Sequence, residues 1–98
     1  METLNEAVAR LEAAGFRDSF QPEDGRLRAL AADCVFSPEE LVVEETVRFE
    51  GESDPGDEAI LFALRSRAGD VRGTFAASYG PGLDAASAEI VRRLARRK

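Results

Sequence analysis

The feature that most constrains the fold is a pair of apolar segments, residues 41–50 and 59–64, that flank an acidic turn. In the first segment apolar and polar residues alternate, which predicts a half-buried strand with one conflict, Glu45 on the apolar side. The second segment is apolar on both faces, which predicts a strand in the middle of a sheet. The turn between them therefore predicts a hairpin. The apolar face of the first strand is predicted to carry Leu41, Val43, Val47 and Phe49.

Helices are predicted near the two ends of the sequence. Thr3 and Glu6 form a capping box, apolar residues then recur at helical spacing, and Gly15 ends the run, so residues 4–14 are expected to be helical. Asp84 is the expected N-cap of a second helix that runs to about residue 96. Its buried stripe is expected to hold Ala86, Ile90, Val91 and Leu94.

The chain between the first helix and residue 41 is predicted to form a hairpin and a connection. Residues 16–21 alternate, with Phe16 and Phe20 on one side, and residues 22–25 have the composition of a turn. Residues 26–31 then return as the second strand, although leucine and alanine also favour a helix over residues 26–32. Residues 33–36 are expected to be connecting chain, and residues 37–40 (Ser-Pro-Glu-Glu) one helical turn.

Residues 71–79 are predicted to be the last strand, with a bulge at Gly73. The connections between strands are too short for parallel crossovers, so we expect an antiparallel sheet. The elements together predict an α+β fold in one domain over residues 1–98. Its sheet is expected to have four to five strands, with the N- and C-terminal helices packed on one face.

Composition argues against several classes of protein. The chain has no histidine and one cysteine, Cys34, so it lacks the commonest general base and can form neither an intrachain disulfide nor a cysteine-based zinc cluster. A net charge of −6 argues against nucleic acid as a partner. No apolar run reaches the roughly 20 residues of a membrane helix. Glu2 and Glu6 stand where a signal peptide carries positive charge, which favours a cytoplasmic location.

The acidic turn and the strand before it hold the candidate site. Arg48 and Glu50 lie two apart on one strand face, where they could pair with each other, or across to Arg72 or Thr74, and hold a polar ligand. The alternative is an ordinary ion pair on a solvated face. The carboxylates of the turn could bind a hard cation, but their spacing lacks the distal glutamate of a calcium loop and fits a solvated hairpin loop. The candidate binding residues are Arg48, Glu50, Asp54, Asp57 and Tyr79. We predict no catalytic residue, metal site or cofactor.

A set of short motifs spans nearly the whole chain. They are Gly15-Phe16, Ser37-Pro38-Glu39-Glu40, Arg48-Phe49-Glu50-Gly51, Ser53-Asp54-Pro55 with Asp57, and Tyr79-Gly80. In these motifs the chain resembles a family of small bacterial and archaeal proteins of unknown function, except that Ser78 stands where alanine is usual. Members are often labelled phosphoribosylpyrophosphate synthetase. That enzyme is much larger and has nucleotide and pyrophosphate loops that this chain lacks, so we regard the label as mistaken.

Two functions from different classes are compatible with the sequence. The open polar face and the lack of catalytic motifs favour a small binding or protein-interaction domain over an enzyme. Its expected assembly is a homodimer formed through a sheet edge or the polar face. The alternative is a small ligand-binding protein or enzyme whose polar site surrounds Arg48, Glu50 and the acidic turn.

Overall fold

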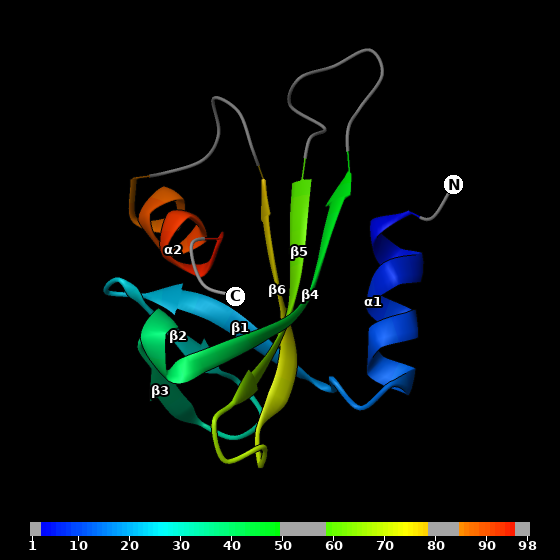
Figure 1. Cartoon of the computed structure of the whole chain (residues 1–98), viewed down its shortest axis with the longest axis horizontal. Coiled ribbons are helices and arrows are strands. Elements are labelled where there is room, and N and C mark those ends of the chain that lie inside the picture. Colours follow the sequence, from blue (N-terminus) through cyan, green and yellow to red (C-terminus); the bar gives the residue numbers. More distant parts are fainter. Residues whose placement is uncertain (1–2, 50–58, 79–84, 96–98) are drawn as a thin grey trace.

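A computed structural model describes residues 3–49, 59–78 and 85–95, which form a six-stranded sheet with a helix near each end (Figure 1). The acidic turn, the predicted break at residues 79–82 and the predicted N-cap Asp84 lie outside the described residues. In chain order the elements are α1 (Leu4–Ala13), β1 (Asp18–Glu23), β2 (Arg26–Ala29), β3 (Cys34–Phe36), η1 (Pro38–Glu40, a 3₁₀ helix), β4 (Leu41–Phe49), β5 (Ala59–Ser66), β6 (Arg72–Ser78) and α2 (Ala85–Ala95).

The predicted capping box fixes the start of α1. The backbone N–H of Thr3 donates to Glu6 Oε1 at 2.8 Å, and the backbone N–H of Glu6 donates to Thr3 Oγ1 at 3.2 Å. Gly15 follows the helix with φ of 111°, a conformation that glycine adopts without strain. The helix over residues 4–14 is therefore confirmed, one residue shorter at its end than expected.

The sheet is mixed, with strand order β3-β2-β1-β6-β5-β4. Every neighbouring pair is antiparallel except β1 and β6, which run parallel through the pairs Asp18–Gly73 and Ser19–Thr74. The prediction of an antiparallel sheet of four to five strands was wrong on both counts. Short connections decide only how consecutive strands pair, and β1 and β6 are far apart in the sequence.

The hairpin of β1 and β2 confirms the strand interpretation of residues 26–29 over the helical one. Its turn is tighter than expected, because β1 continues to Glu23 and only Asp24 and Gly25 lie between the strands. Both have positive φ, 50° and 78°, as a two-residue hairpin turn requires. Residues 34–36, expected to be connecting chain, form β3 on the outer side of β2.

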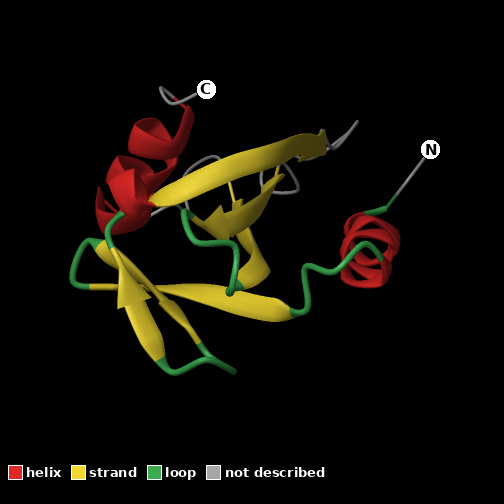
Figure 2. Cartoon of the chain, turned by 60° about the horizontal axis from the view of Figure 1, so that its bottom comes forward, coloured by secondary structure: helices red, strands yellow, loops and turns green. Residues whose placement is uncertain are grey.

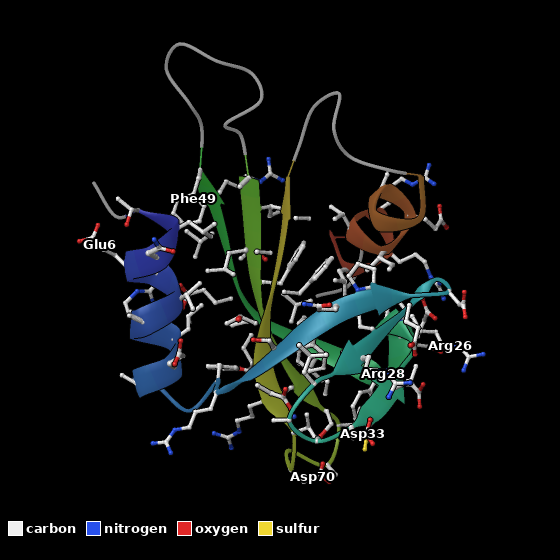
Figure 3. All side chains as sticks on the ribbon, turned by 180° about the vertical axis from the view of Figure 1, so that it is seen from behind. Glu6, Arg26, Arg28, Asp33, Phe49 and Asp70 are labelled. Atoms are coloured by element: carbon white, nitrogen blue, oxygen red, sulfur yellow. The ribbon has the colours of Figure 1, made fainter. Side chains whose placement is uncertain are left out.

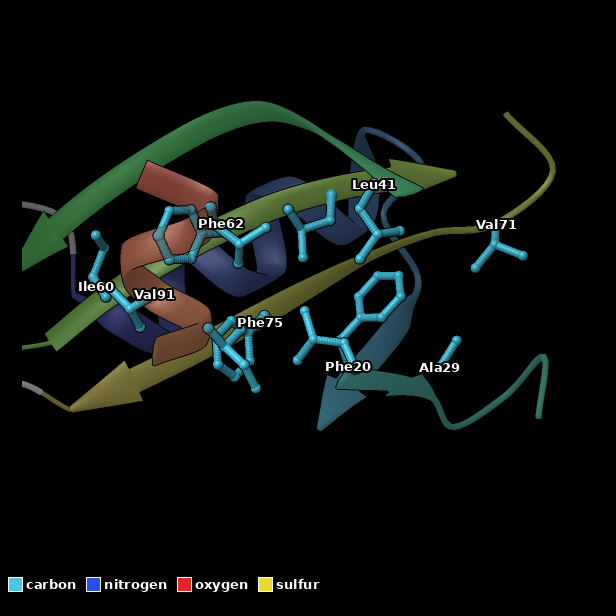
Figure 4. Close-up of a cluster of buried hydrophobic side chains, with 12 residues drawn as sticks. Phe20, Ala29, Leu41, Ile60, Phe62, Val71, Phe75 and Val91 are labelled. Atoms are coloured by element: carbon cyan, nitrogen blue, oxygen red, sulfur yellow. The ribbon is translucent and has the colours of Figure 1, made fainter. Parts of the chain in front are cut away.

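The two halves of the sheet curl toward each other around one core (Figure 2). Leu27 on β2 and Leu41 on β4 belong to the same buried cluster, although three strands separate β2 from β4 in the sheet. Aromatic contacts join neighbouring strands within it: the Phe62 and Phe75 rings stack with centroids 6.2 Å apart (Figure 4). The curvature gives the sheet an inner face, which this cluster covers.

The helices lie on opposite faces of β4, β5 and β6, not on one face as predicted (Figure 1). On the inner face, α2 contributes three residues of its predicted stripe, Ile90, Val91 and Leu94, to the core, while the side chain of Ala86 lies outside the described part of the structure. On the outer face, α1 packs Ala7 and Leu11 against Leu61 and Ala63 of β5. We call these the α2 face and the α1 face. Strand β5 is thus covered on both sides, which explains why it is apolar on both faces.

A bulge in β4 changes the face on which its apolar residues lie. The register shifts between Val43, which pairs with Leu64, and Glu45, which pairs with Ala63. Leu41 and Val43 therefore pack on the α2 face, and Val47 and Phe49 on the α1 face. The prediction of one shared apolar face was wrong because the extra residue reverses the alternation.

Two further details differ from the sequence interpretation. The predicted bulge at Gly73 is absent, since β6 pairs with β5 without interruption from Arg65–Arg72 to Ala59–Ser78. Phe16 precedes β1 and packs near α1, whereas Phe20 lies in the core on the α2 face, so the two rings do not share a side.

Candidate functional site

The residue pairs predicted around Arg48 do not form. Arg48 is exposed on β4 opposite Ile60, and Ile60 in turn pairs with Ala77 of β6. Arg72 and Thr74 pair instead with Arg65 and Ala63, so neither lies across from Arg48. Within the described ranges Arg48 makes no hydrogen bond or ion pair. Its expected companions Glu50, Asp54, Asp57 and Tyr79 lie outside the described residues.

A groove opens at the other end of the sheet, with a volume of about 620 Å³. Three segments line it: the end of the α1–β1 connection, the turn between β2 and β3, and the turn between β5 and β6 with the first residue of β6. In Figure 3, Asp70 marks this end of the molecule and Phe49, the last described residue before the acidic turn, marks the opposite end. The volume is in the range of small-molecule sites, about 300–1,000 Å³. Its lining residues include Gly15, Arg17, Asp18, Gly69, Asp70 and Arg72.

The strand register places arginines side by side in this groove. Asp18 pairs with Gly73 in the parallel junction, so the residues that precede them, Arg17 and Arg72, are neighbours on the same face of the sheet. Arg72 also lies directly opposite Arg65 on β5. Residue 17, just before β1, residue 72 of β6 and residue 65 of β5 thus form a row on the α1 face.

Two members of this row have no neutralising partner in the described part of the chain. Arg65 binds the Glu44 carboxylate through Nε and the Ser66 carbonyl through Nη1. Arg17 and Arg72 are exposed and make no hydrogen bond or ion pair with any described residue. Like charges placed opposite each other on a sheet destabilise it by about 0.2–1 kcal/mol. Two neighbouring arginines without an acidic partner among the described residues are unusual in a chain with 19 acidic and 13 basic residues.

The end of α1 offsets part of this repulsion. A Cβ at Gly15 would lie 3.5 Å from Arg72 Nη1, so the chain leaving the helix passes against the guanidinium. The C-terminal end of a helix carries partial negative charge, which stabilises a nearby cation by about 0.3–1 kcal/mol. The guanidinium still keeps its N–H groups available for a ligand.

Asp18 holds one wall of the groove in place. The residue is 8% exposed, and its carboxylate accepts three hydrogen bonds from backbone N–H groups: Oδ1 from Ser19 at 2.7 Å and Ala31 at 2.8 Å, and Oδ2 from Ala32 at 3.0 Å. These bonds tie the β2–β3 turn to β1. The turn is therefore held against the start of β1.

Asp70 also lines the groove, in the β5–β6 turn, which is likewise closed by hydrogen bonds. The Ser66 hydroxyl donates to Asp70 Oδ1 at 2.6 Å, and the backbone N–H of Val71 donates to the same hydroxyl at 3.2 Å. The backbone N–H of Gly69 donates to the Ser66 carbonyl at 2.9 Å. Asp70 is exposed and faces solvent in the groove.

The groove is suited to binding. Its arginines offer fork-shaped sets of donors that match carboxylate or phosphate oxygens. Among the described residues no group of three or more His, Cys, Asp or Glu side chains could hold a metal ion. Cys34 is exposed, and its thiol donates to the Ala32 carbonyl at 3.4 Å.

Sequence reasoning considered Arg72 only as a partner for Arg48 and did not bring it together with Arg17, because their proximity depends on the parallel junction. Each arginine is the second residue of a predicted strand, over residues 16–21 and 71–79, and nothing in the local pattern links the two. The signal that was available is indirect: Gly73 lies in a strand, where glycine often marks the close approach of another backbone.

Comparison of the chain with models of known protein families, with curated proteins and with solved structures finds no match. The family resemblance of its motifs therefore stays a prediction. No helix in the described ranges is both long enough and apolar enough to cross a membrane.

Proposed function

We propose that the protein is a small binding domain that holds the anionic group of a small ligand between Arg17 and Arg72. The observation that supports the proposal most is the adjacency of two exposed arginine residues, unpartnered among the described residues, in a groove of about 620 Å³. A carboxylate or phosphate oxygen between them would relieve their repulsion and accept charge-assisted hydrogen bonds. The ligand-binding alternative from the sequence is thus retained, at a different place from Arg48 and the acidic turn.

Binding of simple anions tests the proposal. Acetate and inorganic phosphate are titrated into the protein at low ionic strength, and backbone amide shifts are followed by NMR. We expect saturable shifts in the groove segments of the wild type. Arg17→Ala and Arg72→Ala should each weaken binding by about ten- to a hundredfold, which corresponds to the loss of hydrogen bonds to a charged group worth about 1.5–3 kcal/mol.

Arg26→Ala is the matched control. Arg26 is also exposed and unpartnered among the described residues, but it lies at the β1–β2 turn and does not line the groove (Figure 3). Its replacement removes the same charge and should leave anion binding within about twofold of wild type, as expected for a screened distant charge. Equal weakening by Arg26→Ala and Arg72→Ala would contradict the proposal, because it would assign binding to net charge.

The cytoplasmic location expected from the sequence stays a proposal. We also propose that the protein associates with a second copy of itself. This association is supported by β4, which ends the sheet and leaves the backbone groups of its outer edge without a strand partner among the described residues. The bulge and the charged side chains of Glu44 and Arg48 restrict pairing along that edge. Sedimentation velocity at high micromolar concentration tests the dimer, and a strict monomer would refute it.

A further inference from the structure

The groove holds equal numbers of basic and acidic side chains. Its lining residues include two arginines, Arg17 and Arg72, and two aspartates, Asp18 and Asp70. The whole chain carries a net charge of −6. The carboxylates and the negative net charge would repel a ligand with two negative charges. A ligand with one positive and one negative group would match the charges in the groove.

The two carboxylates differ in the acceptor capacity that they have left. A carboxylate offers about four acceptor positions. Asp18 uses three for backbone N–H groups and is nearly buried. Asp70 is exposed and accepts one hydrogen bond in the described part of the chain, from the Ser66 hydroxyl. Only Asp70 can therefore receive a further donor readily.

Asp70 also has the rigidity that a binding group needs. Ser66 is 4% exposed, and its backbone N–H donates to the Val71 carbonyl at 2.8 Å. The Ser66 hydroxyl thus anchors Asp70 Oδ1 to a closed turn and leaves Oδ2 without a described partner. A preorganised acceptor loses less conformational entropy when it binds a ligand than a free side chain does.

We infer that the ligand is a small zwitterion, whose carboxylate lies between Arg17 and Arg72 and whose ammonium group binds Asp70. The inference rests on the proposed function, since it assumes that the arginine pair binds the anionic group. It adds the class of ligand and a specificity-determining residue.

Pairs of acids that differ only in an amino group test the inference. The probes are β-alanine, γ-aminobutyrate and ε-aminocaproate, each compared with propionate, butyrate or caproate, by NMR titration of the full chain. The series covers several separations between the two charged groups. We expect at least one amino acid to bind about two- to fivefold more tightly than its partner, as a partly solvated ion pair provides.

Asp70→Asn should abolish that preference without weakening the plain acids. The amide keeps an oxygen that can accept the Ser66 hydrogen bond, so the turn should fold as before. Asp24→Asn is the control, because it removes the same charge at an exposed turn outside the groove, and asparagine tolerates the positive φ of 50° there. It should leave the preference intact.

The outcomes separate the two proposals. If plain and amino acids bind equally, and both depend on Arg17 and Arg72, the zwitterion inference is wrong and the proposed function stands. A preference that persists in Asp70→Asn, or disappears equally in Asp24→Asn, also overturns the assignment to Asp70. If neither series binds and the simple anions also fail, both proposals are wrong.

Discussion

Replacing Gly73 with alanine should separate the two halves of the sheet. Gly73 pairs with Asp18 at the parallel junction of β1 and β6. A Cβ on Gly73 would lie 2.4 Å from the Asp18 carbonyl oxygen and 2.6 Å from the carbonyl carbon. Ordinary contacts between non-bonded carbon atoms are about 3.5–4.0 Å, so β1 must move by roughly 1 Å.

The expected cost follows from this displacement. Forcing one extra methyl group into a packed site costs about 1–3 kcal/mol. A 1 Å shift would also lengthen the hydrogen bonds of a junction that has two residue pairs, and each lost bond costs about 1 kcal/mol. We expect a loss of about 3–5 kcal/mol, a large fraction of the 5–15 kcal/mol typical of small proteins. The melting temperature should fall by at least about 12 °C.

Urea unfolding followed by far-UV circular dichroism measures the effect, since the chain has no tryptophan. Gly25→Ala is the control, because a Cβ there meets nothing within 4 Å and only the φ of 78° opposes alanine. That control should lose about 1–2 kcal/mol. The reasoning is refuted if Gly73→Ala costs no more than Gly25→Ala. It is also refuted if Asp18→Ala rescues Gly73→Ala, since the closest clash is with the backbone of Asp18 and not its side chain.

Two further predictions concern the groove. Asp18→Ala should destabilise the protein by about 1.5–3 kcal/mol, because three backbone N–H groups lose a charged acceptor. Hydrogen exchange should accelerate at Ala31 and Ala32. Unchanged exchange at these two amides would show that the turn does not depend on the Asp18 carboxylate. Arg17→Gln should leave the unfolding free energy unchanged or raise it by about 0.2–1 kcal/mol in anion-free buffer, since it relieves repulsion with Arg72. A loss above about 1 kcal/mol would mean that Arg17 is held by a stabilising partner.

Local structure was predictable where a few adjacent residues decide it. The capping box, the hairpin turn at Asp24 and Gly25 and the 3₁₀ helix after Ser37 all depend on contacts within four residues. The position of β5 inside the sheet was also predictable, because a strand that is buried on both faces has apolar residues on both. These features give the α+β class and most of the element boundaries.

The faces of the sheet were harder to predict, because one inserted residue reverses them. Glu45 was the single conflict in the pattern of β4, and it marks the bulge. Once the alternation is reversed, Glu45 lies on the α1 face, where its Oε2 accepts a hydrogen bond from Arg10 Nη2 at 2.7 Å. An isolated polar residue on an apolar strand face is therefore better interpreted as a register change than as a buried charge.

The groove could not be predicted, because it depends on pairing between residues far apart in the sequence. A sequence pattern reports periodicity within an element and not which strands become neighbours. Strand β3 shows the same limit on a smaller scale. Its three residues, Cys34 to Phe36, are too few for an alternation to be visible, and it is a strand because β2 offers an edge.

The parallel junction also sets an order of events during synthesis. The partner of Asp18 is made some 55 residues later, which at typical ribosomal rates of about 5–20 residues per second is a delay of several seconds. During this interval the hairpin of β1 and β2 lacks its later partners, so the side chain of Phe20 and the edge of β1 that will pair with β6 stay uncovered. Pro22, which has no N–H to donate, lies on that strand and limits the partners that its edge can recruit. Pro22, the residue that makes β1 look least like a central strand, thus protects the nascent chain from pairing with other strands.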